Sequence, residues 1–161
     1  MILKSSNFLY VFDLDGTVAG SDNWQGFFKN CKLSFRQLHI NPDDLDIRWI
    51  LLTSRPTIDR LLVKLLCWYH KLNPKHIIMG PTFRYKFKSK HQEAEYKSQI
   101  LKDILDEKIK LTYTDAKIEK ICYIDNNIEI TKKMNDLKNN YSYLAMSVPD
   151  FLTRNLEVVL L

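Results

Sequence analysis

Glycine, proline and cysteine are scarce in this chain of 161 residues, which has four glycines, five prolines and three cysteines. So few glycines and prolines exclude a low-complexity chain or a long disordered linker. The cysteines, Cys31, Cys67 and Cys122, are odd in number and widely spaced, and they follow neither a zinc-binding pattern nor a disulfide framework. We therefore expect three reduced, mostly structural thiols in a cytoplasmic protein.

Long apolar runs are also missing. No stretch approaches the ~20 apolar residues that a membrane helix needs, and the first seven residues lack the charged start and apolar core of a signal peptide. We expect no membrane partner. The formal net charge of +5 favours anionic partners, although many proteins with no nucleic-acid role carry as much. The length and an apolar content of 45% predict a single domain over residues 1–161.

Short apolar runs bounded by polar or turn residues predict the strands of a parallel sheet, at 8–13, 48–53, 76–79, 120–125 and 141–148. Amphipathic patterns predict helices at 57–72, 95–105 and 129–139, with a further short one at 22–29. The apolar face expected for the first of these carries Ile58, Leu61, Leu62, Leu65, Leu66 and Tyr69. Strands alternating with helices predict an α/β fold, a Rossmann-like three-layer sandwich around a central, mostly parallel five-stranded sheet.

Polar residues stand where three of the predicted strands end. Asp13 and Asp15 close the first strand, and Asp125 closes the fourth. Thr53, Ser54 and Arg55 come at the end of the second strand. Open α/β sheets bind their ligands at this carboxyl edge, so we expect one shared site there.

The chemistry of these residues suits phosphate and a divalent cation. Paired carboxylates offer the hard oxygen ligands that Mg²⁺ prefers, and an Asp carboxylate can attack phosphorus to form an aspartyl-phosphate. Each motif also has a purely structural interpretation. Asp15 and Gly16 fit a turn, Thr53 or Ser54 fits a helix cap before Pro56, and Asp125 fits an Asx turn.

Lys97 is the expected cation of the site. It falls near the start of the predicted helix 95–105, where the helix dipole disfavours a positive charge, and this position indicates an anionic partner. Asp13 and a substrate phosphate are the partners we expect. Lys86, Lys88 and Lys90 are rivals in the preceding segment, and a solvated surface lysine is the ordinary alternative for each.

The segment 80–92 does not fit the alternation of strands and helices, and it is expected to be a loop or an extended ribbon at the active edge. Between residues 83 and 91, basic residues alternate with aromatic ones. An extended ribbon would place the two kinds on opposite faces. Such a ribbon suits a groove that binds nucleic acid, and it equally suits an ordinary half-buried edge strand.

Taken together, the motifs resemble the haloacid dehalogenase superfamily, specifically its Mg²⁺-dependent phosphatases. They are Asp13-x-Asp15-Gly16-Thr17, then Leu51-Leu52-Thr53-Ser54-Arg55, Lys97 and Ile124-Asp125, in the family's order from residue 8 to about 130. The resemblance implies that Asp13 is the nucleophile, that Asp15 is the general acid and base, and that Thr53 and Lys97 hold the phosphoryl oxygens. It further implies substrate contacts from Gly16, Thr17, Ser54 and Arg55. Mg²⁺ would be held by the Asp13 carboxylate, the Asp15 main-chain carbonyl and Asp125.

The sequence departs from the family pattern in two places, one that affects the metal ligands and one that affects the cap domain. A second acid commonly follows the last motif, whereas here Asn126 and Asn127 come next and Glu129 is the nearest acid, so either Asn126 or Glu129 would support the metal. The two places where the family inserts a cap domain are nearly empty, which implies a capless member with no large cap domain.

An open site suits a phosphate at the end of a large substrate, such as a nucleic-acid terminus. The expected function is therefore a Mg²⁺-dependent phosphomonoesterase, similar to the 3′-phosphatase domains of polynucleotide kinases. One alternative is a nucleotidase or small-metabolite phosphatase whose cap comes from a neighbouring subunit. Another is a catalytically weak binding module. The sequence predicts neither the individual substrate nor the oligomeric state.

Overall fold

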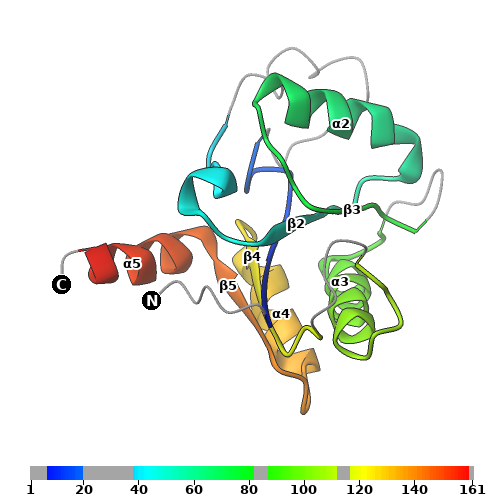
Figure 1. Ribbon diagram of the computed structural model, residues 1–161. Coiled ribbons are helices and arrows are strands. Elements are labelled where there is room, and N and C mark those ends of the chain that lie inside the picture. Colours follow the sequence, from blue (N-terminus) through cyan, green and yellow to red (C-terminus); the bar gives the residue numbers. More distant parts are fainter. Residues whose placement is uncertain (1–6, 20–37, 82–86, 112–116, 160–161) are drawn as a thin grey trace.

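The fold is built on a five-stranded parallel sheet. A computed structural model describes residues 7–19, 38–81, 87–111 and 117–159. The strands are β1 (Phe8–Phe12), β2 (Trp49–Leu52), β3 (Ile77–Ile78), β4 (Lys120–Asp125) and β5 (Tyr143–Ser147). They lie in the order β3-β2-β1-β4-β5, and every neighbouring pair is parallel. All five predicted strands are confirmed, and β1 lies at the centre of the sheet (Figure 1).

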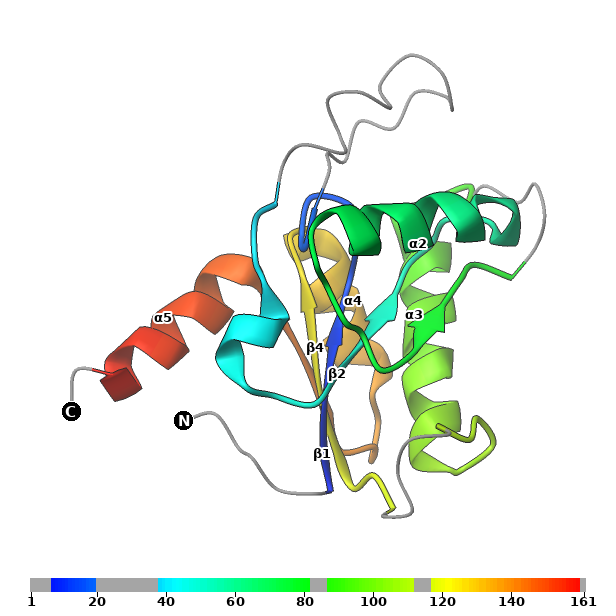
Figure 2. The same ribbon diagram turned by 45° about the horizontal axis from the view of Figure 1, so that its top comes forward.

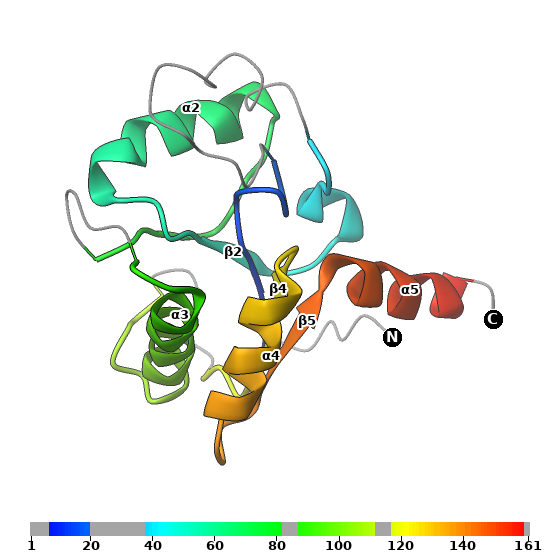
Figure 3. The same ribbon diagram turned by 180° about the vertical axis from the view of Figure 1, so that it is seen from behind.

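Helices cover both faces of this sheet, as the three-layer prediction required. The described helices are α2 (Arg60–Tyr69), α3 (Lys90–Leu105), α4 (Ile128–Leu137) and α5 (Val148–Val159), with 3-10 turns η1 (Pro42–Leu45) and η2 (Thr57–Asp59). Figures 2 and 3 show α3 and α4 on one side of the sheet and α2 and α5 on the other.

The alternation of side chains along β1 shows how the two layers are held. Leu9 and Val11 belong to a buried cluster with residues of α3 and α4, such as Leu101. Tyr10 and Phe12 point to the other face, into a cluster with residues of α2 and α5. Because both faces of a central strand are buried, its sequence is apolar throughout, as expected for a parallel sheet.

The predicted helix 57–72 is confirmed in place, but its expected apolar face is wrong in part. The residues that α2 buries are Val63, Leu66 and Cys67. Four of the residues expected in the core are instead exposed, namely Ile58, Leu61, Leu65 and Tyr69. Leu61, Leu65 and Tyr69 are spaced four residues apart and share one face of α2, and the helix packs on the sheet with the neighbouring face, which carries Val63, Leu66 and Cys67.

Helix α5 was not predicted, although its start carries a recognisable signal. The Ser147 hydroxyl accepts a hydrogen bond from the Asp150 backbone N–H (3.3 Å) and donates one to the Asp150 carboxylate (2.6 Å). This reciprocal pairing is a variant of the capping box, and Pro149 within the first turn is typical of a helix start. The pattern Ser-Val-Pro-Asp therefore marks the end of β5 and the beginning of α5.

The two cysteines that the structure describes agree with the expected structural thiols. Cys67 and Cys122 are buried and unpaired thiols, and burial raises the pKa of Cys67 to about 11 and that of Cys122 to about 12. Cys31 and the predicted helix 22–29 lie outside the described residues.

Within the described part of the chain, no helix combines the length and apolar character that crossing a bilayer would take.

Candidate active site

The two carboxylates of the first motif project from the turn that follows β1. Leu14 between them is fully buried, while Asp13 and Asp15 both line one pocket. The Leu14 carbonyl accepts hydrogen bonds from the N–H groups of the next turn, including that of Val18 at 3.1 Å. Gly16 has a φ of 74°, a left-handed conformation that suits glycine. The turn therefore folds so that alternate residues present acids to the pocket and an apolar side chain to the core.

Lys97 lies at the floor of this pocket and joins three carboxylates. Its Nζ is 2.9 Å from Asp13 Oδ1, 2.9 Å from Asp125 Oδ2 and 3.1 Å from Glu93 Oε1. The Tyr123 hydroxyl donates a further hydrogen bond of 2.6 Å to Asp125 Oδ2. The lysine is 1% exposed, so this network is shielded from water and its interactions are strong.

Burial dominates the electrostatics of the floor. Burial raises the pKa of Asp13 well above its usual value. The positive charge of Lys97 lowers this pKa, and the negative charge of Asp125 raises it further. Burial alone would lower the pKa of Lys97, but the carboxylates of Asp125 and Asp13 raise it well above its ordinary value. Lys97 is thus a permanent cation, and the acids around it are short of positive charge.

The position of Lys97 in its helix differs from the prediction. Helix α3 begins at Lys90, where Ser89 accepts a hydrogen bond from the Gln92 backbone N–H, so Lys97 lies about two turns inside the helix. The helix dipole therefore does not explain its partners; burial beside carboxylates does. The expected loop 80–92 is wrong for Lys90–Gln92, which are helical, and residues 82–86 lie outside the described part.

The rival lysines are not equivalent to Lys97. Lys86 lies outside the described residues, and Lys88 is exposed and does not line the pocket. Lys90 does line the pocket, but its side chain is 49% exposed and lies 3.5 Å from Glu93 Oε2. Of the three candidate lysines that the structure describes, Lys88, Lys90 and Lys97, only Lys97 contacts Asp13.

The end of β2 contributes Arg55, whose guanidinium binds Asp15 through two nitrogens. Arg55 Nε donates to Asp15 Oδ2 at 2.8 Å and Nη2 donates to Asp15 Oδ1 at 2.6 Å. Its Nη1 is 3.9 Å from Asp59 Oδ2, a buried oxygen that has no hydrogen-bond partner among the described residues. Arg55, which was expected to contact substrate, lines the pocket and binds the second motif acid through two nitrogens, a contact that fixes the orientation of that acid.

Thr53 and Ser54 are oriented by neighbours within the fold. Thr53 is fully buried, and its Oγ1 accepts a hydrogen bond of 3.2 Å from the Arg55 backbone N–H. The Ser54 hydroxyl donates a short hydrogen bond to Glu93 Oε1 and lines the pocket. Neither caps the following turn, because the residue at that position is Pro56 and no side chain bonds to the turn. The capping interpretation is therefore wrong.

The edge of β4 is tied to the turn after β1. The Asn126 N–H donates to Thr17 Oγ1 at 2.8 Å, and the Thr17 hydroxyl lies 3.2 Å from Asn126 Oδ1. Thr17 is fully buried, and neither it nor Gly16 lines the pocket. Asp125 does form the Asx turn, since its Oδ1 accepts the Asn127 N–H at 2.8 Å. The turn and the ion pair with Lys97 coexist.

Asn126 and Glu129 also differ in their placement. Asn126 lines the pocket, whereas Glu129 does not and its carboxylate lies 2.6 Å from the Lys133 ammonium, one turn further along α4. Of these two residues, only Asn126 is placed to support a metal held by Asp125.

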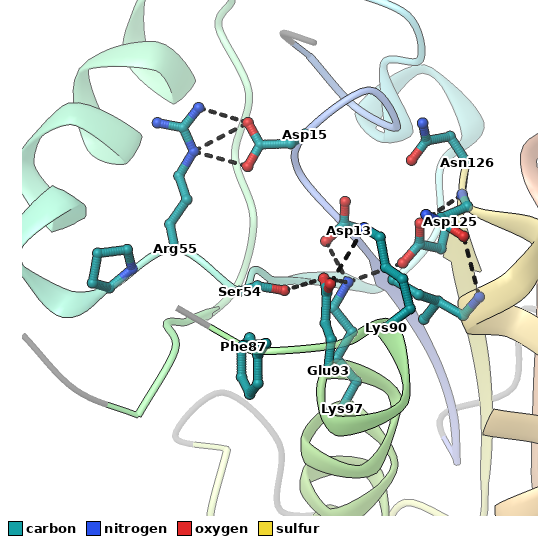
Figure 4. Close-up of a pocket in the computed structure, with 13 residues that line it drawn as sticks. Asp13, Asp15, Ser54, Arg55, Phe87, Lys90, Glu93, Lys97, Asp125 and Asn126 are labelled. Carbon is teal, nitrogen blue, oxygen red and sulfur yellow. Dashed lines mark hydrogen bonds and ion pairs between the residues drawn. The ribbon is translucent and has the colours of Figure 1, made fainter. Parts of the chain in front are cut away.

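The pocket has a volume of about 300 Å³ and an oxygen-rich lining (Figure 4). In Figure 4, α3 carries Glu93 and Lys97 from below, Asp15 and Arg55 lie above, and Asp125 and Asn126 lie to the right. Among the described residues, no three His, Cys, Asp or Glu side chains are grouped as a metal site. The expected Mg²⁺ set uses only two carboxylates, because its third ligand is the Asp15 main-chain carbonyl.

Two residues of the network were missing from the sequence-based set. Glu93 lies four residues before Lys97, a spacing that brings a glutamate and a lysine together on a helix. The capping pattern Ser89-x-x-Gln92 would have placed both residues on the same helix. Tyr123 lies two residues before Asp125 on β4, so the two side chains share a face of the strand.

Comparisons with known proteins add evidence on the fold. No protein-family model matches the chain, and no curated protein does. A solved structure of the Pnkp1/Rnl/Hen1 RNA repair complex contains a chain that is similar, with a TM-score of 0.55 and 15% identity. The match covers 88% of the present chain and 42% of the other, so this chain spans less than half of its neighbour's length. At this identity the likeness shows a common fold.

Proposed function

We propose that this chain is a Mg²⁺-dependent phosphomonoesterase of the haloacid dehalogenase type, which acts through an aspartyl-phosphate on Asp13. The observation that carries the proposal is the position of Lys97 between Asp13 and Asp125, in the pocket that also contains Asp15. This arrangement supports the proposal because two acids and a buried cation meet at the carboxyl edge of a parallel sheet, where such folds bind their ligands.

The charge of the floor fits a divalent cation. Asp13, Asp125 and Glu93 share the ammonium of Lys97, and Glu93 is also paired with Lys90, so one negative charge is left in excess when all five groups are ionised. The Asp13 and Asp125 carboxylates and the Asp15 carbonyl would hold Mg²⁺ through hard oxygen ligands, with Asn126 beside them. When bound, the ion supplies positive charge that lets a dianionic phosphate approach the acids.

In the proposed reaction, an oxygen of Asp13 attacks phosphorus and the bond to the leaving oxygen breaks. Asp15 gives its proton to that oxygen, so an alcohol leaves and an aspartyl-phosphate remains. Asp15 then takes a proton from a water molecule that attacks the same phosphorus. Inorganic phosphate is released, and both acids return to their starting states. Lys97 keeps Asp13 oriented and balances charge on the phosphoryl group.

Arg55 has a positioning role in this scheme. Its two-nitrogen contact holds the Asp15 carboxylate in one orientation at the pocket wall. When Asp15 takes up a proton, the charge that Arg55 balanced disappears, and the guanidinium becomes available to an anionic substrate. The same side chain would thereby serve the acid and the phosphate in turn.

We further propose that the substrate is the terminal phosphate of a nucleic acid. Residues 60–92 contain eight Lys or Arg and no Asp or Glu, and Lys90 of this stretch lines the pocket, which supports an anionic polymer as substrate. The structural neighbour belongs to an RNA repair complex, which agrees with this choice of substrate.

Phosphate release in the presence of Mg²⁺ tests the proposal. We expect turnover of 3′-phosphorylated oligonucleotides to exceed that of sugar phosphates and free nucleotides, with the Asp13→Asn protein as the inactive control. Equal or faster turnover of the small compounds would contradict the nucleic-acid substrate and favour a nucleotidase or metabolite phosphatase. No release from any phosphate ester would contradict the enzyme and favour a binding module.

A further inference from the structure

The side of the pocket formed by the start of α3 differs in chemistry from its floor. It presents the ring of Phe87 and the ammonium of Lys90, whereas the floor consists of ion-paired acids. Figure 4 shows the two residues on either side of Glu93, with Phe87 below Ser54. An aromatic ring and a half-exposed cation in the lining of one pocket are a combination that the phosphate chemistry at Asp13 does not need.

Phe87 is held in place by its neighbours. Its ring packs on the ring of Tyr96, with centroids 5.3 Å apart and planes inclined by 33°. The Tyr96 hydroxyl donates a hydrogen bond of 2.6 Å to the Met79 carbonyl, which fixes that ring to the end of β3. Next along the chain, the Lys88 N–H donates to Gln92 Oε1 at 3.0 Å. The ring is therefore preorganised, and little entropy would be lost if a ligand stacked on it.

Lys90 is placed to meet an anion. It belongs to the first turn of α3, lines the pocket and keeps its side chain 49% exposed. Its ion-pair partner Glu93 also binds Lys97 and Ser54. The Lys90 ammonium lies 3.5 Å from the Glu93 carboxylate, which is longer than the contact between Glu93 and Lys97. A half-exposed ion pair of this length contributes little to stability, and an incoming phosphate can replace it.

We propose that Phe87 and Lys90 form a subsite for the terminal nucleotide of a single-stranded nucleic acid, with Phe87 stacking on its base and Lys90 contacting the adjoining phosphodiester. This inference rests on the proposed function, because it places the terminal phosphate at Asp13. A flat ring and a second negative charge next to the scissile phosphate are what a chain end offers. A sugar phosphate lacks the flat ring, and a free mononucleotide lacks the second phosphate.

Three substrates separate these contributions: a 3′-phosphorylated trinucleotide, the same compound with an abasic terminal residue, and glycerol 2-phosphate. Relative to glycerol 2-phosphate, Phe87→Ala should lower kcat/KM for the trinucleotide about tenfold, the size of one base–aromatic stack. The abasic compound should show no such loss, since its stack is already missing. Phe87→Trp should restore the preference.

Lys90→Gln should lower kcat/KM for both trinucleotides, with a loss that shrinks as salt is raised, and should spare a nucleoside 3′-monophosphate. Trp68→Ala and Lys132→Gln are matched controls. Trp68 is an aromatic residue 78% exposed on α2, Lys132 is an exposed lysine on α4, and neither lines the pocket. We expect neither control to change the ratio between trinucleotide and glycerol 2-phosphate.

The outcomes distinguish the subsite from the enzyme. An equal loss with all three substrates in Phe87→Ala, or an equal effect of Trp68→Ala, would overturn the subsite and leave the phosphatase proposal intact. If wild type releases no phosphate from any substrate, the phosphatase proposal fails. Binding of the labelled trinucleotide, measured by fluorescence anisotropy, then decides on the subsite. About tenfold weaker binding in Phe87→Ala supports it, and unchanged binding overturns it.

Discussion

The Lys97 ammonium lies 2.9 Å from Asp13 Oδ1, although the two residues are 84 positions apart in the chain. The contact joins the middle of α3 to the end of β1, and both side chains are buried. A buried ammonium is stable only beside carboxylates, and buried carboxylates need a cation. The pair therefore stabilises the fold as well as preparing the site.

Replacing Lys97 by methionine should destabilise the protein by about 3–5 kcal/mol, because three buried or partly buried carboxylates lose their shared cation. Urea denaturation at neutral pH measures the loss. Lys132→Met, on the exposed face of α4, should change the free energy of unfolding by less than about 0.5 kcal/mol. A loss below about 1 kcal/mol in Lys97→Met would show that the carboxylates do not depend on this ammonium.

Asp13→Asn should abolish phosphate release, by about 10⁴-fold or more, because an amide cannot form the acyl-phosphate. The fold should survive, since the amide oxygen can still accept the hydrogen bond from Lys97. Mg²⁺ should raise the melting temperature of wild type and EDTA should reverse the rise. The variant should show a much smaller shift. Equal Mg²⁺ shifts in both proteins would place the metal away from Asp13.

Arg55→Lys tests the orientation of Asp15. Lysine keeps the positive charge but cannot make the two-nitrogen contact seen at 2.6 and 2.8 Å. We expect kcat to fall about a hundredfold, at the lower end of what general acid–base catalysis contributes. Arg60→Lys, an exposed position on α2, is the control and should keep the kcat of wild type. Wild-type turnover in Arg55→Lys would show that Asp15 needs no orientation by Arg55.

The sheet and the acids of the site were predictable from the sequence for a common reason. Apolar runs such as Leu9–Phe12 mark buried parallel strands, and the polar residue after each run must lie at the same edge. The shared direction of the strands therefore predicts that Asp13, Asp125 and the end of β2 lie near one another. This prediction needs only the order of strands and their shared direction.

The partners of these residues were not predictable in the same way. Whether Arg55 reaches substrate or Asp15 depends on distances of a few ångströms between two loops, which no periodicity records. Lys97 does contact Asp13, but the helix-dipole reason that predicts this contact is wrong, because α3 begins after Ser89 and not near Glu95. In α2, two adjacent faces carry apolar residues, and only the packing against the sheet determines that Val63, Leu66 and Cys67 are the buried set.

Asp59→Asn should give a pH-dependent gain in stability. Burial raises the pKa of Asp59 above its value in the unfolded chain, although Arg55 opposes the shift. The folded state then holds its proton more tightly, so ionisation destabilises the protein as pH rises through and above this range. At neutral pH we expect the variant to gain at most about 1 kcal/mol. Below about pH 3 the difference from wild type should vanish. A larger gain at acid pH than at neutral pH would contradict the sign.

Gly80→Ala should disturb the site from the end of β3. A Cβ at this position would lie 2.6 Å from the Ser54 carbonyl oxygen and 3.0 Å from that of Arg55, and both neighbours are backbone atoms. The Gly80 N–H also donates to the Arg55 carbonyl at 2.8 Å, so the two loops cannot separate without losing this bond. We expect a loss of about 1–3 kcal/mol in the free energy of unfolding. Phosphate release should fall as well, because Ser54 and Arg55 move with their backbone.

Pro81→Ala, the exposed neighbouring position, is the control for thermal melting and turnover. A Gly80→Ala protein with the melting temperature and kcat of wild type would show that the β2 end tolerates displacement.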